Sequence, residues 1–432
     1  MALSKATAGP SGASADSSVK TYIPEKILSG QQVESNQASS LIQEPLAVGD
    51  RPYRLPSVSV VIPVHNGGEG FRRCLQALSR SIAQAKSTGA KPTQQNSLGS
   101  PSSADAGAQM AQDAVDIEVI VVADGDSDGS WKLAESFGAR LIRLPESKGP
   151  ARARNTGANA AKGDILFFID ADVEVHAATL HQVMESFAKA PNLAALIGSY
   201  DDAPGEPNFL SQYRNLLHHY THQTASLNAS TFWGACGAIR RCVFQQVGGF
   251  DSGYRRPCIE DIELGYRVRQ AGHKIHLRKD IQVKHLKHWS AFSLLRADFF
   301  YRALPWTALL LQLKRVNPQQ YRTVSRELNI SRRSRLSVVL VYGLVAAVAI
   351  APWYGQSWAM AAIAGLALLL LNLSVYAFFY QSRGLIFALQ TVPWHWLYFA
   401  YSGLAYAIGH LRYLWKSAAR WLLAGTSRLL PR

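Results

Sequence analysis

Cysteine is scarce in this sequence. The 432 residues contain four, and these lie far apart (Cys74, Cys236, Cys242 and Cys258). They form no CxxC pair and have no histidine partner at zinc-finger spacing, which argues against a zinc ribbon or a disulfide framework. The pattern is typical of reduced thiols in a cytosolic compartment.

Other absences narrow the class of function. The N-terminal segment has no apolar run of the kind that a secretory signal contains, so we expect none. No GxGxxG fingerprint follows the first predicted strand, which counts against a dehydrogenase with a dinucleotide cofactor. Acidic residues are outnumbered, with 30 Asp and Glu against 45 Lys and Arg and a net charge of +15. Such a balance suits nucleic acid, an anionic membrane or phosphorylated substrates. The apolar residues concentrated after Leu336 favour the membrane over nucleic acid.

Composition divides the chain into five parts. Residues 1–50 are rich in Ser, Ala, Gly and Gln without a hydrophobic period, which predicts disorder. Residues 51–290 have the pattern of a folded domain, interrupted at 86–114 by a Ser- and Gln-rich insertion that we expect to be a flexible loop. The remaining parts are expected to be interfacial helices over 291–335, a membrane region over 336–411, and a basic tail over 412–432.

Short apolar strands alternate with helical segments in the folded domain. The pattern predicts strands at 58–64, 117–122, 140–144 and 165–169, with helices between them. Alternating strands and helices are typical of an α/β fold with a doubly wound, mostly parallel sheet. We therefore expect a Rossmann-like domain followed by an α-helical membrane region.

The stretch KGDILFFIDADVE places two carboxylates, Asp170 and Asp172, directly after a buried strand. On an extended backbone, residues i and i+2 point to the same side, and the carboxyl ends of parallel strands are where such sheets bind ligands. Two anions held together need a cation, and a divalent ion carrying phosphate oxygens would serve. The alternative is a solvated acidic turn that only caps the next helix.

Two other clusters also have alternative interpretations. Glu260 and Asp261 open a predicted helix, where the helix dipole keeps a carboxylate ionised, and they either steady that helix or face a ligand. His218 and His222 have the i,i+4 spacing of metal ligands. Surface or acceptor-facing histidines are the simpler interpretation of that pair.

The C-terminal third contains long apolar runs. We expect membrane spans at 336–354 and 358–380, joined by an uncharged link and flanked by Arg332–Arg335 and Arg383. The positive-inside rule then places the large N-terminal domain in the cytoplasm of a multi-pass protein of the inner or plasma membrane. The segment 385–411 is either a third span with its tail outside, or a re-entrant or interfacial segment with its tail inside.

Several motifs in order carry a family resemblance. They are VSVVIPVHN, VIVVADGDSDGS, KGPARARNTGANAAKGDILFFIDADVE, GGFD and IEDIELGYRVRQAG. From about residue 57 to about residue 306 the chain resembles the family 2 inverting glycosyltransferases, which have a GT-A nucleotide-sugar domain. The resemblance implies transfer of a hexose from a nucleotide sugar, with a UDP-sugar favoured, to a lipid-linked or other envelope glycan acceptor.

The resemblance also implies roles for residues that would hold the donor. Pro63 and Asp124 would lie at the nucleotide base. Arg154 and Asn155 would help to shape the same pocket, and Asp170 would approach the ribose or the diphosphate.

The reacting groups follow by the same resemblance. Asp172, with His285 as a candidate second ligand, would bind the Mg²⁺ or Mn²⁺ that bridges the diphosphate. Asp261 would be the general base that takes the proton of the acceptor hydroxyl. A nucleotidyltransferase that uses the same acidic metal site, and an inactive membrane scaffold, are the alternatives.

The sequence departs from the family pattern at three points. Ala123 stands where the family often has an acid, Asp126 replaces the usual Ser, and His65 replaces the usual Tyr. These differences would change the contacts with the donor base and therefore the choice of nucleotide. The QxxRW motif of processive polysaccharide synthases is absent, which favours addition of single sugars.

Overall fold

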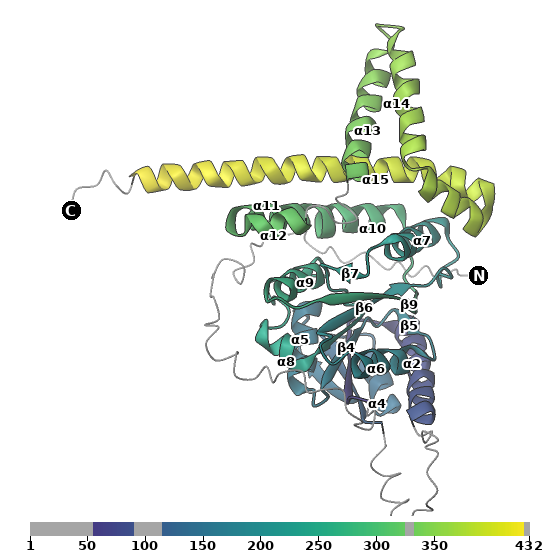
Figure 1. Ribbon diagram of the computed structural model, residues 1–432, viewed down its shortest axis with the longest axis vertical. Coiled ribbons are helices and arrows are strands. Elements are labelled where there is room, and N and C mark those ends of the chain that lie inside the picture. The colour runs from purple at the N-terminus through teal and green to yellow at the C-terminus, as the bar shows by residue number, and fades with distance from the viewer. Residues whose placement is uncertain (1–54, 90–114, 325–331, 427–432) are drawn as a thin grey trace, which may run out of the picture.

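The computed structural model describes residues 55–89, 115–324 and 332–426 (Figure 1). The segment expected to be disordered, 1–50, lies outside the described residues, as does most of the expected loop insertion. The described part has an α/β domain at one end and a set of long helices at the other (Figure 1).

The α/β domain is built on one sheet, with strand order β3-β2-β1-β4-β8-β6-β9-β5 and β7 beside β9. The strands are β1 (Val58–Val64), β2 (Ile117–Asp124), β3 (Arg140–Leu144), β4 (Ile165–Ile169), β5 (Val173–Val175), β6 (Ala195–Tyr200), β7 (Asn228–Ala229), β8 (Cys236–Arg240) and β9 (Ile275–His285). The first four are parallel to one another, whereas β8 runs antiparallel to both of its neighbours, and β5 and β7 run antiparallel to β9. The Rossmann-like expectation is confirmed, but these antiparallel pairs make the sheet mixed.

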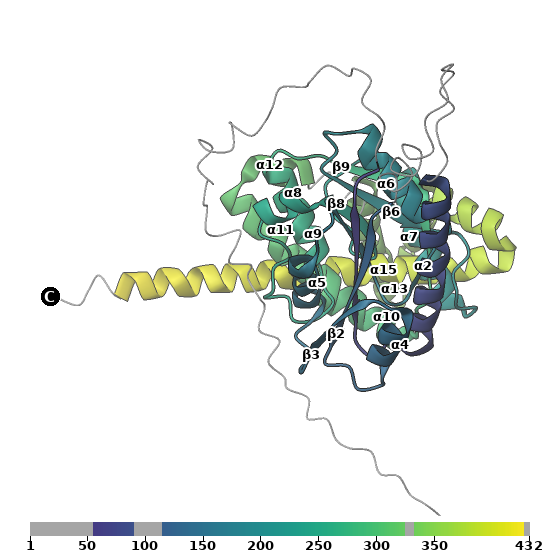
Figure 2. The ribbon, with the colours of Figure 1, turned by 90° about the horizontal axis from the view of Figure 1, so that it is seen from below.

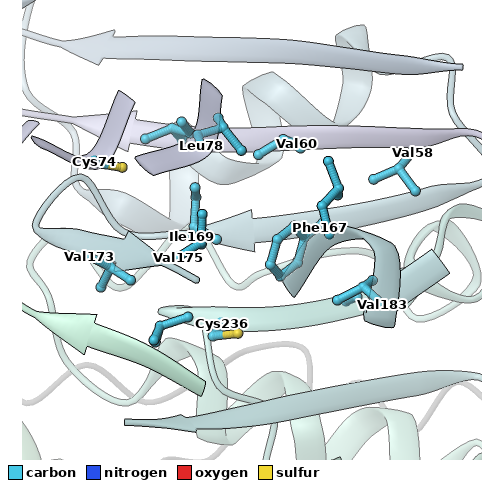
Figure 3. Packing of buried hydrophobic residues seen from close by; sticks show 14 of the residues in the cluster. Val58, Val60, Cys74, Leu78, Phe167, Ile169, Val173, Val175, Val183 and Cys236 are labelled. Carbon is cyan, nitrogen blue, oxygen red and sulfur yellow. The ribbon is translucent and has the colours of Figure 1, made fainter. Parts of the chain in front are cut away.

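Helices cover both faces of the sheet, which explains the unbroken apolar strands. They are α2 (Gly68–Gly89), α4 (Ser130–Phe137), α5 (Pro150–Ala160), α6 (Thr179–Lys189), α7 (Phe209–Thr224), α8 (Arg241–Gln246) and α9 (Glu260–Gln270). Strand β1 shows the division. Val60 faces a core that includes Leu78 of α2 and Val183 of α6 (Figure 3), whereas Val61 faces the core that includes Ala153 of α5.

The C-terminal helices form two groups. They are α10 (Ala291–Arg296), the π-helix η1 (Ala297–Ala303), α11 (Leu304–Val316), α12 (Pro318–Val324), α13 (Arg332–Ile350), α14 (Ser357–Leu371) and α15 (Leu373–Thr426). Helices α10 to α12 lie over the α/β domain, and α15 runs across above them (Figures 1 and 2). Helices α13 and α14 form a hairpin that projects away from the domain (Figure 1).

Only part of the expected membrane region has the length of a full span. Among the described residues, α13 is the one single helix long and apolar enough to cross a membrane. Helix α14 has 15 residues, or about 22 Å, and is bent by 64° against α15 at Asn372. Helix α15 contains the ambiguous segment 385–411, with a break at Gly384. Helix α15 runs across the base of the hairpin and not beside it (Figure 1).

Candidate functional site

The candidate site is a cavity of about 1830 Å³ at the carboxyl ends of β1, β2 and β4. Pro63 and Asp124 line one end of it. The cavity passes Asp172 and Asp261 and continues to residues of the C-terminal helices, including Tyr406. One continuous space therefore joins the sheet to the helices that follow it.

Asp124 is a buried residue at the end of β2, and its carboxylate organises the next loop. It accepts hydrogen bonds from the Ser147 hydroxyl (3.0 Å) and from the backbone N–H groups of Lys148 and Gly149 (both 2.9 Å). His65 Nδ1 lies 2.7 Å from the backbone oxygen of Asp124. Asp124 lines the cavity and fixes the loop that begins α5, and its role at the nucleotide base stays a prediction.

Asp170 and Asp172 lie in a turn and not on an extended strand. The Val173 N–H donates to the Asp170 carbonyl at 3.2 Å, and β5 begins at Val173. Both acidic residues line the cavity, but each has a different partner. The turn therefore places the two carboxylates next to different residues: Asp170 contacts Arg154 and Asp172 contacts His285.

Asp172 lies beside His285 because β5 and β9 are paired. Val173 and His285 are register partners in that antiparallel pair, and His285 Nε2 is 3.6 Å from Asp172 Oδ2. Burial opposes ionisation of Asp172, but the charges of His285 and then Lys287 outweigh it and lower its pKa to about 2. Asp172 is therefore ionised at neutral pH.

Asn215 and Tyr200 orient the His285 ring. His285 Nδ1 lies 2.8 Å from Asn215 Oδ1 of α7, and the ring stacks on Tyr200 with centroids 4.6 Å apart. Because an amide oxygen only accepts, Nδ1 carries a proton, and Nε2 is the ring nitrogen that faces Asp172. Metal binding by His285 stays a prediction.

The donor set fits a divalent ion that also binds phosphate. The described residues contain no group of three His, Cys, Asp or Glu side chains that could hold a metal alone. Mg²⁺ is usually bound through one or two carboxylates together with water and substrate phosphates. Asp172 and His285 would therefore hold the ion only in part, and phosphate oxygens and water would complete its coordination.

Arg154 of α5 connects the two acidic motifs. Its Nη2 donates to Asp170 Oδ1 at 2.6 Å and its Nη1 donates to Glu260 Oε1 at 2.9 Å. Burial opposes the charge on Arg154, but Asp170 and then Glu260 outweigh it and raise its pKa. Glu260 also accepts the Cys258 N–H at 2.8 Å. Because Arg154 bonds to both Asp170 and Glu260, it ties the start of α9 to the turn after β4.

Asp261, at the start of α9, also lines the cavity. Its Oδ2 accepts the Gly234 N–H at 3.1 Å and its Oδ1 accepts the Ile262 N–H at 2.8 Å. Burial and then the charge of Glu260 raise its pKa to about 6, although the Gly234 N–H and Arg154 act in the opposite direction. A pKa near the working pH is what a general base requires.

Asn155 lies outside the cavity that its neighbour Arg154 lines. Its Nδ2 donates to the Phe250 carbonyl at 2.8 Å and its Oδ1 accepts the Phe250 N–H at 2.9 Å. It is not among the described residues that line the cavity. Asn155 fastens α5 to the GGFD segment, so any effect on the pocket is indirect.

His218 and His222 face the cavity and not the outer surface. Their ring centroids are 4.4 Å apart, and both rings pack against Trp233. Burial lowers the pKa of His222 to about 4 and that of His218 well below its usual range, so both rings are neutral. They are therefore not surface histidines, and contact with an acceptor stays a prediction.

The comparisons with known proteins agree with this site. Residues 107–248 match the family described as Glycosyl transferase family 2, and residues 214–289 match the family described as N-terminal domain of galactosyltransferase. The first segment contains Asp124, Asp170 and Asp172, and the second contains Asp261 and His285.

Two curated relatives and one solved structure illustrate the similarity. Glycosyltransferase AglE of Haloferax volcanii is 31% identical over 128 residues, which are 28% of this chain and 32% of the relative. Pre-mycofactocin glycosyltransferase of Mycobacterium tuberculosis is 24% identical over 280 residues, which are 60% of this chain and 50% of the relative. A mannosyltransferase from Pyrobaculum calidifontis in complex with GDP-Man and Mn²⁺ has a TM-score of 0.44 and 16% identity, over 89% of this chain and 95% of that chain.

The chain thus spans between a third and a half of the length of these curated relatives. Apart from Asp298, the acidic residues that line the cavity all lie within the two matched segments. The chain contains a glycosyl transferase family 2 domain.

Proposed function

We propose that this protein is a membrane-associated, inverting glycosyltransferase. It would move a sugar from a nucleoside diphosphate sugar to a hydroxyl of a lipid-linked or envelope glycan. The observation that carries the proposal is the position of two kinds of carboxylate in one cavity. Asp172 has a low pKa and a histidine beside it, and Asp261 has a raised pKa and no arginine hydrogen-bonded to it among the described residues.

The donor side of the site would use the Asp172–His285 pair. A divalent cation held there would neutralise the charge that grows on the leaving diphosphate. Asp170 is already hydrogen-bonded to Arg154, which supports a role next to the donor and not as a full metal ligand. Pro63 and Asp124 line the end where the base would lie, and a UDP-sugar remains the donor that we favour.

The acceptor side would use Asp261. Two backbone N–H groups donate hydrogen bonds to its carboxylate and hold it in place. The ionised carboxylate would accept the proton of the acceptor hydroxyl as the hydroxyl oxygen attacks the anomeric carbon. A single displacement of this kind inverts the anomeric configuration. It requires a base on one face and a stabilised leaving group on the other, and no covalent nucleophile.

The helical hairpin supports association with a membrane. Only 17% of the apolar window of α13 is buried, whereas a core helix of a soluble domain would be mostly buried. Trp353 and Tyr354 at its tip are 77% and 69% exposed. At its base, Arg333 bonds to Ser374 and Arg383 bonds to the Asp202 carbonyl. Cationic residues at that end are what the positive-inside rule expects of a cytoplasmic domain at an inner or plasma membrane.

The test is an assay of the purified full chain in lipid nanodiscs with Mn²⁺ or Mg²⁺. UDP-, GDP- and dTDP-sugars would be offered with a lipid extract as acceptor, and released nucleotide would be identified. We expect a nucleoside diphosphate and a product of inverted configuration. Release of pyrophosphate would indicate nucleotidyl transfer instead, and a retained configuration would overturn inversion.

Matched variants complete this experiment. Asp172→Ala and Asp261→Ala should each abolish release. Asp116→Ala removes an exposed carboxylate outside the cavity and should leave release unchanged. No release from any donor, or equal release from all four proteins, would overturn the proposed activity.

A further inference from the structure

A buried ion cluster joins three elements on the membrane side of the cavity. Asp298 of the π-helix is 4% exposed. Its Oδ1 accepts from Arg302 Nη1 at 2.7 Å and lies 3.1 Å from Arg214 Nη2 of α7. Its Oδ2 accepts from the Tyr401 hydroxyl of α15 at 2.6 Å. All four side chains belong to residues that line the cavity.

The cluster has more positive than negative charge. Two guanidinium groups share the single carboxylate of Asp298, which leaves one positive charge over. Lys287 adds another: its Nζ lies 4.8 Å from the centre of the Trp289 ring, and the Arg302 guanidinium lies 5.7 Å from the same ring. Among the ion pairs of the described residues, none involves Lys287, although its charge also acts on Asp172. Arg214, Arg302 and Lys287 with Asp298 therefore carry a net positive charge.

The arginine side chains remain partly accessible from the cavity. The side chain of Arg302 is 40% exposed and that of Arg214 is 17% exposed, although their carboxylate partner is buried. Asp298 would thus hold the two guanidinium groups in place and leave other N–H groups available. Planar guanidinium groups are well suited to bind phosphate through paired hydrogen bonds. Both Asp298 and Arg302 lie on a π-helix, a distortion that is frequent at functional sites.

The location separates this cluster from the nucleotide end. Asp124 lies at the end of β2 within the sheet, whereas Tyr401 belongs to α15, above α10 and α11 (Figure 1). A ligand that reached Asp261 from the membrane would pass this wall. A phosphate near its lipid chain would meet the arginine residues, while its sugar would extend towards the base.

We propose that Arg214, Arg302 and Lys287 bind the phosphate group of a lipid-linked acceptor. The proposal rests on the proposed function and names the chemical class of the acceptor. A lipid phosphate is chosen over free phosphate because the cavity continues between these residues and the apolar helices α13 and α15.

Calorimetry on the full chain in detergent tests the proposal without any donor. The probes are farnesyl phosphate, farnesol and inorganic phosphate. We expect farnesyl phosphate to bind at least tenfold more tightly than either of the others. Equal binding of farnesyl phosphate and farnesol would overturn an anion site. Equal binding of farnesyl phosphate and inorganic phosphate would overturn the assignment to a lipid.

Three variants locate the binding. Arg302→Gln should weaken binding of farnesyl phosphate at least tenfold and leave farnesol unchanged. Asp298→Asn should preserve or strengthen phosphate binding, because it frees the two arginine residues, whereas a purely structural ion cluster would only become less stable. Arg278→Gln is the matched control, since Arg278 pairs with Asp280 outside the cavity, and it should change nothing.

Binding of two ligands to Arg302→Gln distinguishes an acceptor-phosphate site from an additional contact with the nucleotide donor. If Arg302→Gln weakened binding of a nucleoside diphosphate with Mn²⁺ and left farnesyl phosphate unaffected, the cluster would serve the donor and the proposal would be wrong. Nucleotide release from the donor panel reports separately on the proposed function. Loss of that activity with retained phosphate preference would overturn the proposed function alone.

Discussion

His285 Nε2 lies 3.6 Å from Asp172 Oδ2, although the two residues are more than a hundred positions apart in the chain. The three-residue strand β5 brings them together by pairing with the end of β9. Asn215 fixes the tautomer of the histidine through Nδ1. The candidate metal site is thus a consequence of strand pairing.

Asn215→Ala should raise the Mn²⁺ concentration needed for half-maximal activity by about 10- to 100-fold, because the His285 ring loses the partner that orients it. The measurement is a metal titration of nucleotide release. Asn192→Ala, at an exposed position, is the control. An unchanged metal requirement in Asn215→Ala would contradict the assignment of His285 as a ligand.

The rate should depend on pH through Asp261. Its pKa is raised to about 6, and the base acts in its deprotonated form, so kcat/KM should rise with pH and level off above about 7. Glu260→Gln removes a negative charge that favours the protonated form, so it should move the acidic limb to lower pH. A limb that stays in place in Glu260→Gln would show that another group controls it.

Helix α9, which carries Asp261, is in very close contact with the chain at Thr231 and Phe232. A Cβ atom at Gly265 would overlap the backbone there. Gly265→Ala should therefore destabilise the fold by about 1–3 kcal/mol and lower activity by displacing Asp261. Urea unfolding and nucleotide release would be measured together. In Gly343→Ala, where a Cβ meets nothing within 4 Å, both should be retained.

If the hairpin inserts into a membrane, a lysine on α13 should reduce membrane recovery of the protein, whereas a lysine on α11 should not. Val345 is 58% exposed on α13, so Val345→Lys should not disturb packing. In a bilayer the same change costs about 2.5–3.5 kcal/mol, and it should shift protein from the membrane fraction to the soluble fraction. Val316→Lys, at a 42% exposed position on α11, is the control. Equal membrane recovery for both variants would contradict insertion of the hairpin.

Much of the α/β half could be predicted because its signals are local. The strands β1, β2 and β4 contain short, largely apolar runs, and Asp124 and Asp170 directly follow two of these runs. The positions of the antiparallel strands were not predicted. Strands β5 and β7 have three and two residues, too short for a period to be visible, and β8 lies in a glycine-containing segment without alternation. The turn at Asp170 was missed because β5 is so short.

Other parts of the site depend on contacts that no local pattern encodes. Asn215 and Tyr200 contact His285, and Asp298 pairs with Arg214, each across many residues of sequence. The apolar runs indicated helices after residue 336 but not the bend at Asn372. That bend accompanies hydrogen bonds from the Asn372 amide to the Ser337 hydroxyl and the Leu368 carbonyl.

The central claim is that Asp172 holds the donor through a metal while Asp261 performs the proton transfer. Calorimetric binding of the nucleoside diphosphate of the active donor, with and without Mn²⁺, tests it in wild type, Asp172→Asn and Asp261→Asn. We expect Mn²⁺ to strengthen binding in wild type and Asp261→Asn but not in Asp172→Asn, and transfer to be lost in both variants. Metal-enhanced binding that persists in Asp172→Asn, or transfer that persists in Asp261→Asn, would contradict the claim.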